Sequence, residues 1–150
     1  MDKKSIVLYA SVHHGNTKKV VDAMQECQKS DLIDVTKAKD IDISGYDIII
    51  IASGVYFSKP HKSIIEAVNK FHFSDNQKVF LVITTGSNPE STGKKMKEFF
   101  EKLNIKIDDV FACKGFDTYG PFKLIGGIAK GCPTEKDLEN AKSFMVNIIE

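Results

Sequence analysis

The sequence predicts a single α/β domain in which a five-stranded parallel sheet carries helices on both faces. Its 150 residues suit one domain with a full-sized core. Short apolar runs alternate with stretches of helical period, without a repeat or a flexible linker between them. Residues 46–52 form an almost continuous β-branched run, which is typical of a strand buried on both faces.

The other strands follow from similar apolar runs. We expect strands at residues 5–8, 32–35, 46–52, 79–83 and 110–113. Because these strands alternate with helices, right-handed crossovers and a parallel sheet are expected.

Each predicted helix shows apolar residues three or four positions apart. The faces expected to be buried are Val20, Val21, Met24 and Cys27, then Ile64, Ile65, Val68 and Phe71, then Met96, Phe99, Phe100 and Leu103, and finally Leu138, Ala141, Met145 and Ile148. Pro60 is predicted to lie in the first turn of the second helix, where proline is tolerated. Residues 134–137 resemble a capping box and open the last helix.

Charge and cysteine content exclude several classes of protein. With 21 basic and 20 acidic residues the net charge is +1, so bulk charge indicates neither a nucleic-acid nor a membrane partner. No apolar run reaches the roughly 20 residues of a membrane span, and the first strand begins too early for a signal peptide. We therefore expect a cytoplasmic protein without membrane insertion.

Three widely spaced cysteines, Cys27, Cys113 and Cys132, argue against a disulfide framework or a zinc site. Cys27 and Cys113 are expected in the core, because they fall on an apolar helix face and in a buried strand. The four histidines are scattered, so no metal site is predicted.

The loop between the first strand and the first helix is suited to hold an anion. Free backbone N–H groups and the positive end of the helix dipole converge there. Ser11, Asn16 and Thr17 add short donors, and Gly15 allows close approach of a ligand. We expect this loop to bind a phosphate group. The alternative is an ordinary strand-to-helix turn capped by Ser or Asn.

The loop lacks the motifs of several other phosphate sites. It has no Gly-x-Gly-x-x-Gly of a dinucleotide site and no Gly-Lys-Ser/Thr ending of a nucleoside-triphosphate loop. It also has no cysteine placed as a phosphatase nucleophile, and the chain contains no arginine. An acidic pair of the kind found in phospho-acceptor receiver domains is missing after the first strand.

Two further loops should reach the same ligand, because ligands in such sheets bind beyond the carboxyl ends of the strands. Residues 53–59 place a glycine and two aromatic residues after the central strand. Residues 84–88 end the next strand with small polar side chains. Aromatic faces and backbone donors suit a planar ring.

These loops resemble those of the flavodoxin family. The Ser-x-x-x-Gly-Asn-Thr loop is similar to the family's FMN-phosphate loop, and Tyr46-Asp47 followed by an apolar run into Ser-Gly-Val-Tyr is similar to its central strand and flavin loop. Residues 115–127 resemble the late loop of several short members. The resemblance covers essentially the whole chain. It implies a flavodoxin-like three-layer sandwich with strand order 2-1-3-4-5, and FMN as the cofactor.

The residues expected to bind FMN come from all of these loops. They are Ser11, Val12, His13, His14, Gly15, Asn16 and Thr17 around the phosphate, Ser53, Gly54, Val55, Tyr56 and Phe57 after the central strand, Thr85, Gly86 and Ser87 after the fourth strand, and Tyr119 in the late loop. Tyr56 is the expected stacking residue, with Phe57 and Tyr119 as alternatives. No side chain is persuasively placed as a general acid, base or nucleophile, so no catalytic residue is predicted.

The leading functional hypothesis is an FMN-binding electron carrier. A small FMN-dependent oxidoreductase acting on a quinone or a protoporphyrinogen is the alternative, because the longer spacing created by residues 12–14 is more like that of the flavodoxin-like protoporphyrinogen oxidases. Those enzymes carry a long insertion at the region matching residues 87–93, where this chain has a short loop. A cofactor-free signalling or structural domain is a third hypothesis.

The expected partner is a redox protein or a small quinone. Family members that are strongly acidic meet basic reductases, whereas Lys18, Lys19 and Lys59 lie in or beside the proposed cofactor edge of this chain. We therefore expect weak attraction to a basic reductase.

Overall fold

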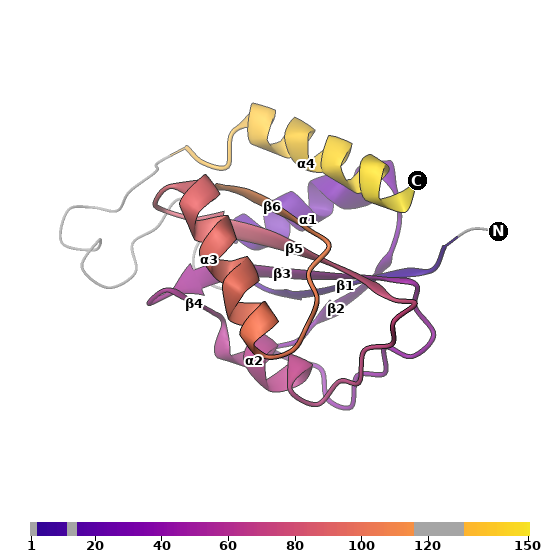
Figure 1. Ribbon diagram of the computed structural model, residues 1–150. Coiled ribbons are helices and arrows are strands. Elements are labelled where there is room, and N and C mark those ends of the chain that lie inside the picture. The colour runs from indigo at the N-terminus through magenta and orange to yellow at the C-terminus, as the bar shows by residue number, and fades with distance from the viewer. Residues whose placement is uncertain (1–2, 12–14, 116–130) are drawn as a thin grey trace.

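A computed structural model describes residues 3–11, 15–115 and 131–150, and forms a three-layer α/β/α sandwich (Figure 1). The central sheet contains five parallel strands in the order β2-β1-β3-β5-β6. Their bounds are Ser5–Ala10 for β1, Asp31–Asp34 for β2, Ile48–Tyr56 for β3, Lys78–Thr85 for β5 and Asp109–Lys114 for β6. Counted among the parallel strands alone, this is the predicted order 2-1-3-4-5. The predicted fold class is therefore confirmed.

A short sixth strand, β4 (Lys59–Pro60), pairs antiparallel with the end of β3. The prediction that Pro60 begins a helix is therefore wrong. Helix α2 (Lys62–Val68) starts after His61, whose Nδ1 accepts a hydrogen bond from the Ser63 amide at 3.1 Å. Proline is compatible with a two-residue edge strand, because a strand edge leaves some N–H groups unused.

The helices cover the two faces of the sheet in pairs (Figure 1). Helix α1 (Asn16–Cys27) and helix α4 (Glu135–Ile149) pack on one face, and α2 with α3 (Pro89–Lys102) packs on the other. The capping box of α4 is confirmed, since Thr134 and Asp137 exchange side-chain and backbone hydrogen bonds. Helix α2 is shorter than predicted, and Phe71 packs against the core from beyond its end.

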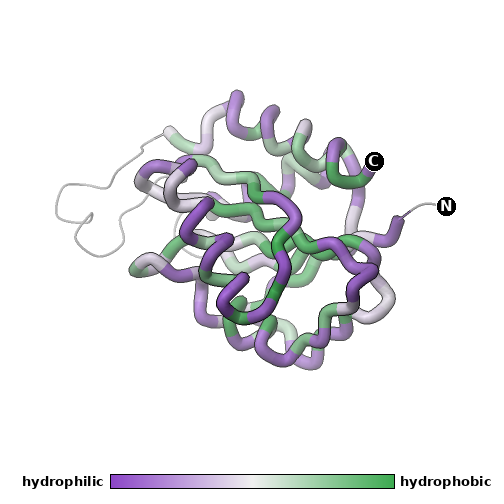
Figure 2. The backbone as a smooth tube through the Cα atoms, in the orientation of Figure 1, coloured by the Kyte–Doolittle hydropathy of each residue, from purple (hydrophilic) through white to green (hydrophobic). Residues whose placement is uncertain are grey.

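Strand β3 divides the core into two halves. Ile49 and Ile51 point into the cluster beneath α2 and α3, whereas Ile48 and Ile50 point into the cluster beneath α1 and α4. All four side chains are at most 1% exposed. Figure 2 shows the corresponding hydrophobic band along the central strands. The prediction of a strand buried on both faces is confirmed. No helix in the described ranges is long and apolar enough to cross a membrane.

Cysteine positions agree only in part with expectation. Cys113 is buried on β6, as predicted, with 3% exposure. Cys27 is exposed rather than in the core, because it is the last residue of α1 and lies beyond the helical turns that contact the sheet. Burial raises the pKa of the Cys113 thiol from its ordinary 9.0 to about 12.

This difference predicts two rates of thiol modification. At pH 8 iodoacetamide should alkylate Cys27 readily and leave Cys113 untouched until the chain is unfolded, because the thiolate is the reacting form. Mass spectrometry of the peptides measures both rates. Equal alkylation of Cys27 and Cys113 in the folded protein would contradict this description.

The raised pKa of Cys113 also predicts a pH dependence of folding stability. The folded state keeps a proton on Cys113 that the unfolded chain releases, so this thiol should lower the free energy of unfolding progressively from pH 9 to pH 12.

Candidate functional site

The parallel sheet brings the predicted binding loops to one edge. Ala10 lies beside Ser53, Gly54 beside Thr84, and Thr85 beside Lys114. The carboxyl ends of β1, β3, β5 and β6 are thus at matching levels, and the chain segments after them share one edge. Val12, His13, His14 and Tyr119 lie outside the described residues.

The N-cap residue of helix α1 has no side chain. It is Gly15, with φ +67°, which is a left-handed conformation that glycine adopts at little cost. The first turn is capped from the end of β1 instead, because Ser11 Oγ accepts a hydrogen bond from the Lys18 amide at 3.1 Å. The alternative prediction of a strand-to-helix turn capped by Ser or Asn is therefore confirmed for Ser11, although neither residue type occupies the N-cap position.

A buried pair of hydroxyls joins α1 to the end of β5. Thr17 Oγ1 and Thr84 Oγ1 are 2.9 Å apart, and these residues are 2% and 4% exposed. A hydroxyl can donate one hydrogen bond and accept two. When Thr84 donates to Thr17, the Thr17 hydroxyl keeps its own proton for another acceptor. Sequence reasoning assigned Thr17 to the phosphate and placed Thr84 in the polar segment near the ring, but it did not predict this hydrogen bond between them.

Asn16 and Gly115 fit together across the same edge. A Cβ atom on Gly115 would lie 2.6 Å from Asn16 Nδ2 and 2.9 Å from Asn16 Cβ, so only glycine fits there without a shift. The Gly115 amide also donates to the Thr85 carbonyl at 2.8 Å. The sequence placed Gly115 in the late loop, but nothing in it indicated this contact with the first helix.

The segment predicted as a loop at residues 53–59 is a hairpin. Strand β3 continues to Tyr56, and Val55 and Tyr56 pair with Pro60 and Lys59 of β4. This extension is favoured because the antiparallel partner supplies hydrogen bonds that a free loop would lack. The residues Ser53 to Tyr56 are therefore held in a regular strand.

Ser53 and Tyr56 brace this hairpin internally. The buried Ser53 hydroxyl donates to the Gly54 carbonyl at 2.7 Å and accepts from the His61 amide at 3.0 Å. The Tyr56 ring lies over Gly54, where an added Cβ would be 3.3 Å from the tyrosine hydroxyl. It also meets the His61 ring edge-on, with centroids 5.3 Å apart. Gly54 thus provides room for the ring of Tyr56.

The turn of the hairpin is strained. Phe57 and Ser58 have φ of +51° and +64°, the pattern of a two-residue type I′ turn. Left-handed backbone costs a residue with a side chain about 1–2 kcal/mol. The turn presents Phe57 to solvent, with 71% of its surface exposed.

The segment after β5 contains a chain of hydroxyl groups. Ser87 Oγ lies 3.1 Å from Thr85 Oγ1 and 3.3 Å from Thr92 Oγ1, and the Ser87 amide donates to Thr85 Oγ1 at 3.2 Å. Asn88 caps α3 by accepting from the Ser91 amide at 3.0 Å. Thr85 is buried and Ser87 exposed, so this segment runs from the sheet to the rim.

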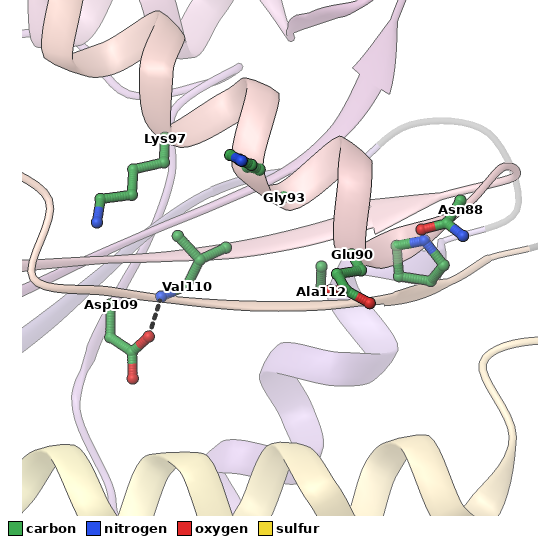
Figure 3. Close-up of a pocket in the computed structure, with 9 residues that line it drawn as sticks. Asn88, Glu90, Gly93, Lys97, Asp109, Val110 and Ala112 are labelled. Carbon is green, nitrogen blue, oxygen red and sulfur yellow. Dashed lines mark hydrogen bonds between the residues drawn. The ribbon is translucent and has the colours of Figure 1, made fainter.

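A groove of about 660 Å³ lies elsewhere, between α3 and the outer edge of β6 (Figure 3). Gly93 faces Val110 and Ala112 there, while Asp109 accepts a hydrogen bond from the Val110 amide at 2.8 Å. A carboxylate on an edge-strand amide protects that edge from pairing. Its lining includes Asn88, the last residue of the predicted 84–88 segment, but no residue that was individually predicted to bind the cofactor. Within the described ranges no cluster of three or more His, Cys, Asp or Glu residues could hold a metal ion.

Comparison with known proteins identifies the family. A family model described as a flavodoxin domain matches residues 6–121. The chain therefore belongs to the flavodoxin domain family.

A protein of Methanocaldococcus jannaschii called uncharacterized is 37% identical over 150 residues, covering 98% of this chain and 99% of that protein.

The three-layer fold of this chain is also found in solved structures of low sequence identity. An NAD(P)H:quinone oxidoreductase from Methanothermobacter marburgensis matches 100% of this chain and 98% of its own, with a TM-score of 0.67 and 9% identity.

Rubredoxin:oxygen oxidoreductase from Desulfovibrio gigas has the same TM-score, 0.67, with 16% identity, and 97% of this chain corresponds to 35% of that protein. A flavoprotein from Lactobacillus acidophilus, solved in complex with FMN, has a TM-score of 0.55 and 20% identity over 75% of this chain and 93% of its own. At these identities the structural likeness concerns the fold.

The contact between Gly115 and Asn16 predicts that alanine at position 115 destabilises the fold more than alanine at another glycine position. Gly115→Ala should destabilise the fold by about 1–3 kcal/mol, because overpacking displaces Asn16 and the start of α1. Gly45→Ala is the matched control, since the nearest atom to its Cβ is Lys4 Nζ at 4.0 Å. Urea denaturation followed by circular dichroism measures both. Equal stability of the two variants would rule out a tight fit at Gly115.

Proposed function

We propose that the protein binds FMN at the carboxyl edge of the sheet and serves as an electron-transfer flavoprotein. The observation that carries this proposal is the start of α1, where a glycine cap, the Thr17–Thr84 pair and the Asn16–Gly115 fit form a rigid polar cradle. The amino-terminal end of a helix binds phosphate well, because its backbone N–H groups and the positive end of its dipole face the anion. The FMN complex of the related fold from Lactobacillus acidophilus supports the choice of cofactor.

The phosphate would be held by amides and hydroxyls rather than by a positive side chain. Lys18 and Lys19 are the basic residues of the first turn; Lys19 is exposed, and Lys18 Nζ lies 2.7 Å from Asp22 Oδ1. This hydrogen bond raises the pKa of Lys18 and keeps its charge paired with Asp22. The Lys18 amide already donates to Ser11 Oγ, so the amides before it at the start of α1 and the Thr17 hydroxyl provide the donors in this proposal.

The flavin ring would lie between the hairpin and the segment after β5. Tyr56 supplies a half-buried aromatic face over Gly54, and Thr85 to Ser87 supply backbone and hydroxyl donors. When bound, FMN supplies the redox chemistry, while the protein sets its access and its electrostatic surroundings. The residues of this chain hold and orient the ring, and we assign none of them a covalent step.

A second candidate function is reduction of a small quinone by the same cofactor. It is favoured by the NAD(P)H:quinone oxidoreductase from Methanothermobacter marburgensis, whose fold matches 100% of this chain with a TM-score of 0.67. Steady NADH or NADPH oxidation with a quinone, without an added reductase, would favour this alternative.

Thr17 provides the sharpest test of the phosphate cradle. Thr17→Val should weaken FMN binding roughly 10- to 150-fold, because a hydrogen bond to a charged group contributes about 1.5–3 kcal/mol. Riboflavin, which lacks the phosphate, should lose much less affinity. Fluorescence titration measures both ligands.

Thr84→Val is the matched control for this experiment. It removes the same internal hydrogen bond and leaves the Thr17 hydroxyl in place. If it weakens FMN as much as Thr17→Val does, Thr17 only positions the helix and does not contact the phosphate. An equal loss for riboflavin and FMN would contradict the cradle itself.

Tyr56 provides the test of the ring position. Stacking on an aromatic ring quenches flavin fluorescence, so Tyr56→Leu should restore much of the emission of bound FMN. Phe57→Leu, one residue further along the hairpin, should leave the quenching unchanged. The opposite result would transfer the stacking role to Phe57.

A further inference from the structure

The hydroxyl groups of Thr85, Ser87 and Thr92 form a chain that runs from the end of β5 into helix α3. Thr92, the fourth residue of α3, is 8% exposed, and its Oγ1 lies 3.3 Å from Ser87 Oγ. Ser87 Oγ in turn lies 3.1 Å from Oγ1 of Thr85, which is 6% exposed. Two buried hydroxyls are thus joined through an exposed one at the rim of the sheet.

This hydroxyl chain lies on the other face of the sheet from the Thr17–Thr84 pair. Successive side chains of a strand point to opposite faces, so Thr84 reaches Thr17 of α1, while Thr85 connects through Ser87 to α3. Helix α3 also contacts β4, which pairs with the hairpin strand that carries Tyr56. The hydroxyl chain therefore belongs to the ring side of the proposed site, and the phosphate cradle to the other side.

The backbone around Thr92 determines where its hydroxyl proton points. A threonine in a helix often donates this proton to the carbonyl four residues earlier, which here belongs to Asn88. That carbonyl already accepts the Thr92 amide at 3.1 Å and the Ser91 hydroxyl at 3.4 Å. A carbonyl oxygen has two lone pairs, so both are in use. The Thr92 hydroxyl therefore donates to Ser87.

The same direction continues to Thr85. Ser87 accepts from Thr92 and gives its own proton to Thr85 Oγ1, which also accepts the Ser87 amide at 3.2 Å. A hydroxyl accepts two hydrogen bonds and donates one, so Thr85 has its accepting positions filled and its proton left over. In the opposite direction Thr85 would give this proton to Ser87 and would have none for a ligand.

We propose that Thr92 is a positioning residue for the flavin ring, because through Ser87 it holds the Thr85 hydroxyl as a hydrogen-bond donor to a ring carbonyl oxygen. The proposal rests on the proposed function, which places Thr85 to Ser87 beside the ring. A fixed donor favours a ligand that presents an oxygen at this point. It disfavours one that presents an N–H there, because two facing donors leave each other unsatisfied.

Thr92→Val tests the start of the hydroxyl chain with little change in side-chain volume. Without the Thr92 proton, Ser87 and Thr85 can reverse their hydrogen bond, and the donor to the ring is lost. Affinity should fall about 2- to 10-fold, and by the same factor for FMN and riboflavin, since the phosphate is not involved. Thr92→Ser keeps the hydroxyl and should restore both affinities. Fluorescence titration measures them, and circular dichroism verifies the fold.

A double variant tests whether Thr92 acts through Thr85. In a Thr85→Val background the final donor is already absent, so adding Thr92→Val should cause no further loss. Ser87→Ala interrupts the hydroxyl chain at the exposed rim without altering α3, and should weaken both ligands as Thr92→Val does. Infrared spectra of bound FMN provide a second readout. A ring carbonyl stretch should move to higher frequency in Thr92→Val and stay in place in Thr92→Ser.

Several results would overturn the role of Thr92. These are unchanged affinity in Thr92→Val and Ser87→Ala, no restoration by Thr92→Ser, or additive losses in the double variant, which would reduce Thr92 to a packing residue of α3. A loss confined to FMN would also overturn it and would assign Thr92 to the phosphate cradle. Failure of the proposed function is recognised separately, because the unmodified protein would then bind neither FMN nor riboflavin.

Discussion

The site depends on one constraint, the parallel direction of strands that are buried on both faces. Ile48 to Ile51 of β3 have no solvent-facing side, so helices cover both faces, and the connections between the parallel strands cross over. All carboxyl ends then meet at one edge. Polar residues that follow the strands, among them Thr84 and Thr85, are brought together there while remaining buried. The apolar core therefore determines where a ligand can bind.

Contacts across that edge keep its components in place. The Thr17–Thr84 hydrogen bond joins α1 to β5, and the absence of a side chain on Gly115 admits Asn16 beside the end of β6. On the other side, Ser53 fixes the hairpin to the start of α2 through the His61 amide. These buried hydroxyls and close approaches form within the protein alone, and a site whose parts are already in place loses less entropy on binding. The hairpin then extends this edge outward to Phe57.

The sequence predicted well those features that repeat along the chain. Strand and helix periodicity located the strands and the core, because many residues contribute to each of these patterns. The family resemblance implied the strand order, and a four-residue motif indicated the capping box of α4. The sequence predicted poorly the features that depend on a few atoms. A two-residue strand has no period, so β4 was missed and Pro60 was assigned to a helix.

The same limit applies within the candidate site. Residue type does not disclose that Phe57 and Ser58 adopt positive φ, since neither is a residue that favours it. The fit between Gly115 and Asn16 joins residues about a hundred positions apart, and only the folded chain reveals it. The sequence therefore predicted that these segments share one edge of the sheet, but not the contacts between them.

The central claim is that the start of α1 holds the phosphate of FMN. Backbone amide NMR of the isotope-labelled protein tests it most directly. Titration with FMN should shift the amides of Gly15, Asn16 and Thr17 strongly, and riboflavin should shift them far less while affecting Gly54 to Tyr56 in a similar way. Equal shifts of the α1 amides with both ligands, or FMN-induced shifts confined to the opposite end of the sheet around Lys78, would contradict the account.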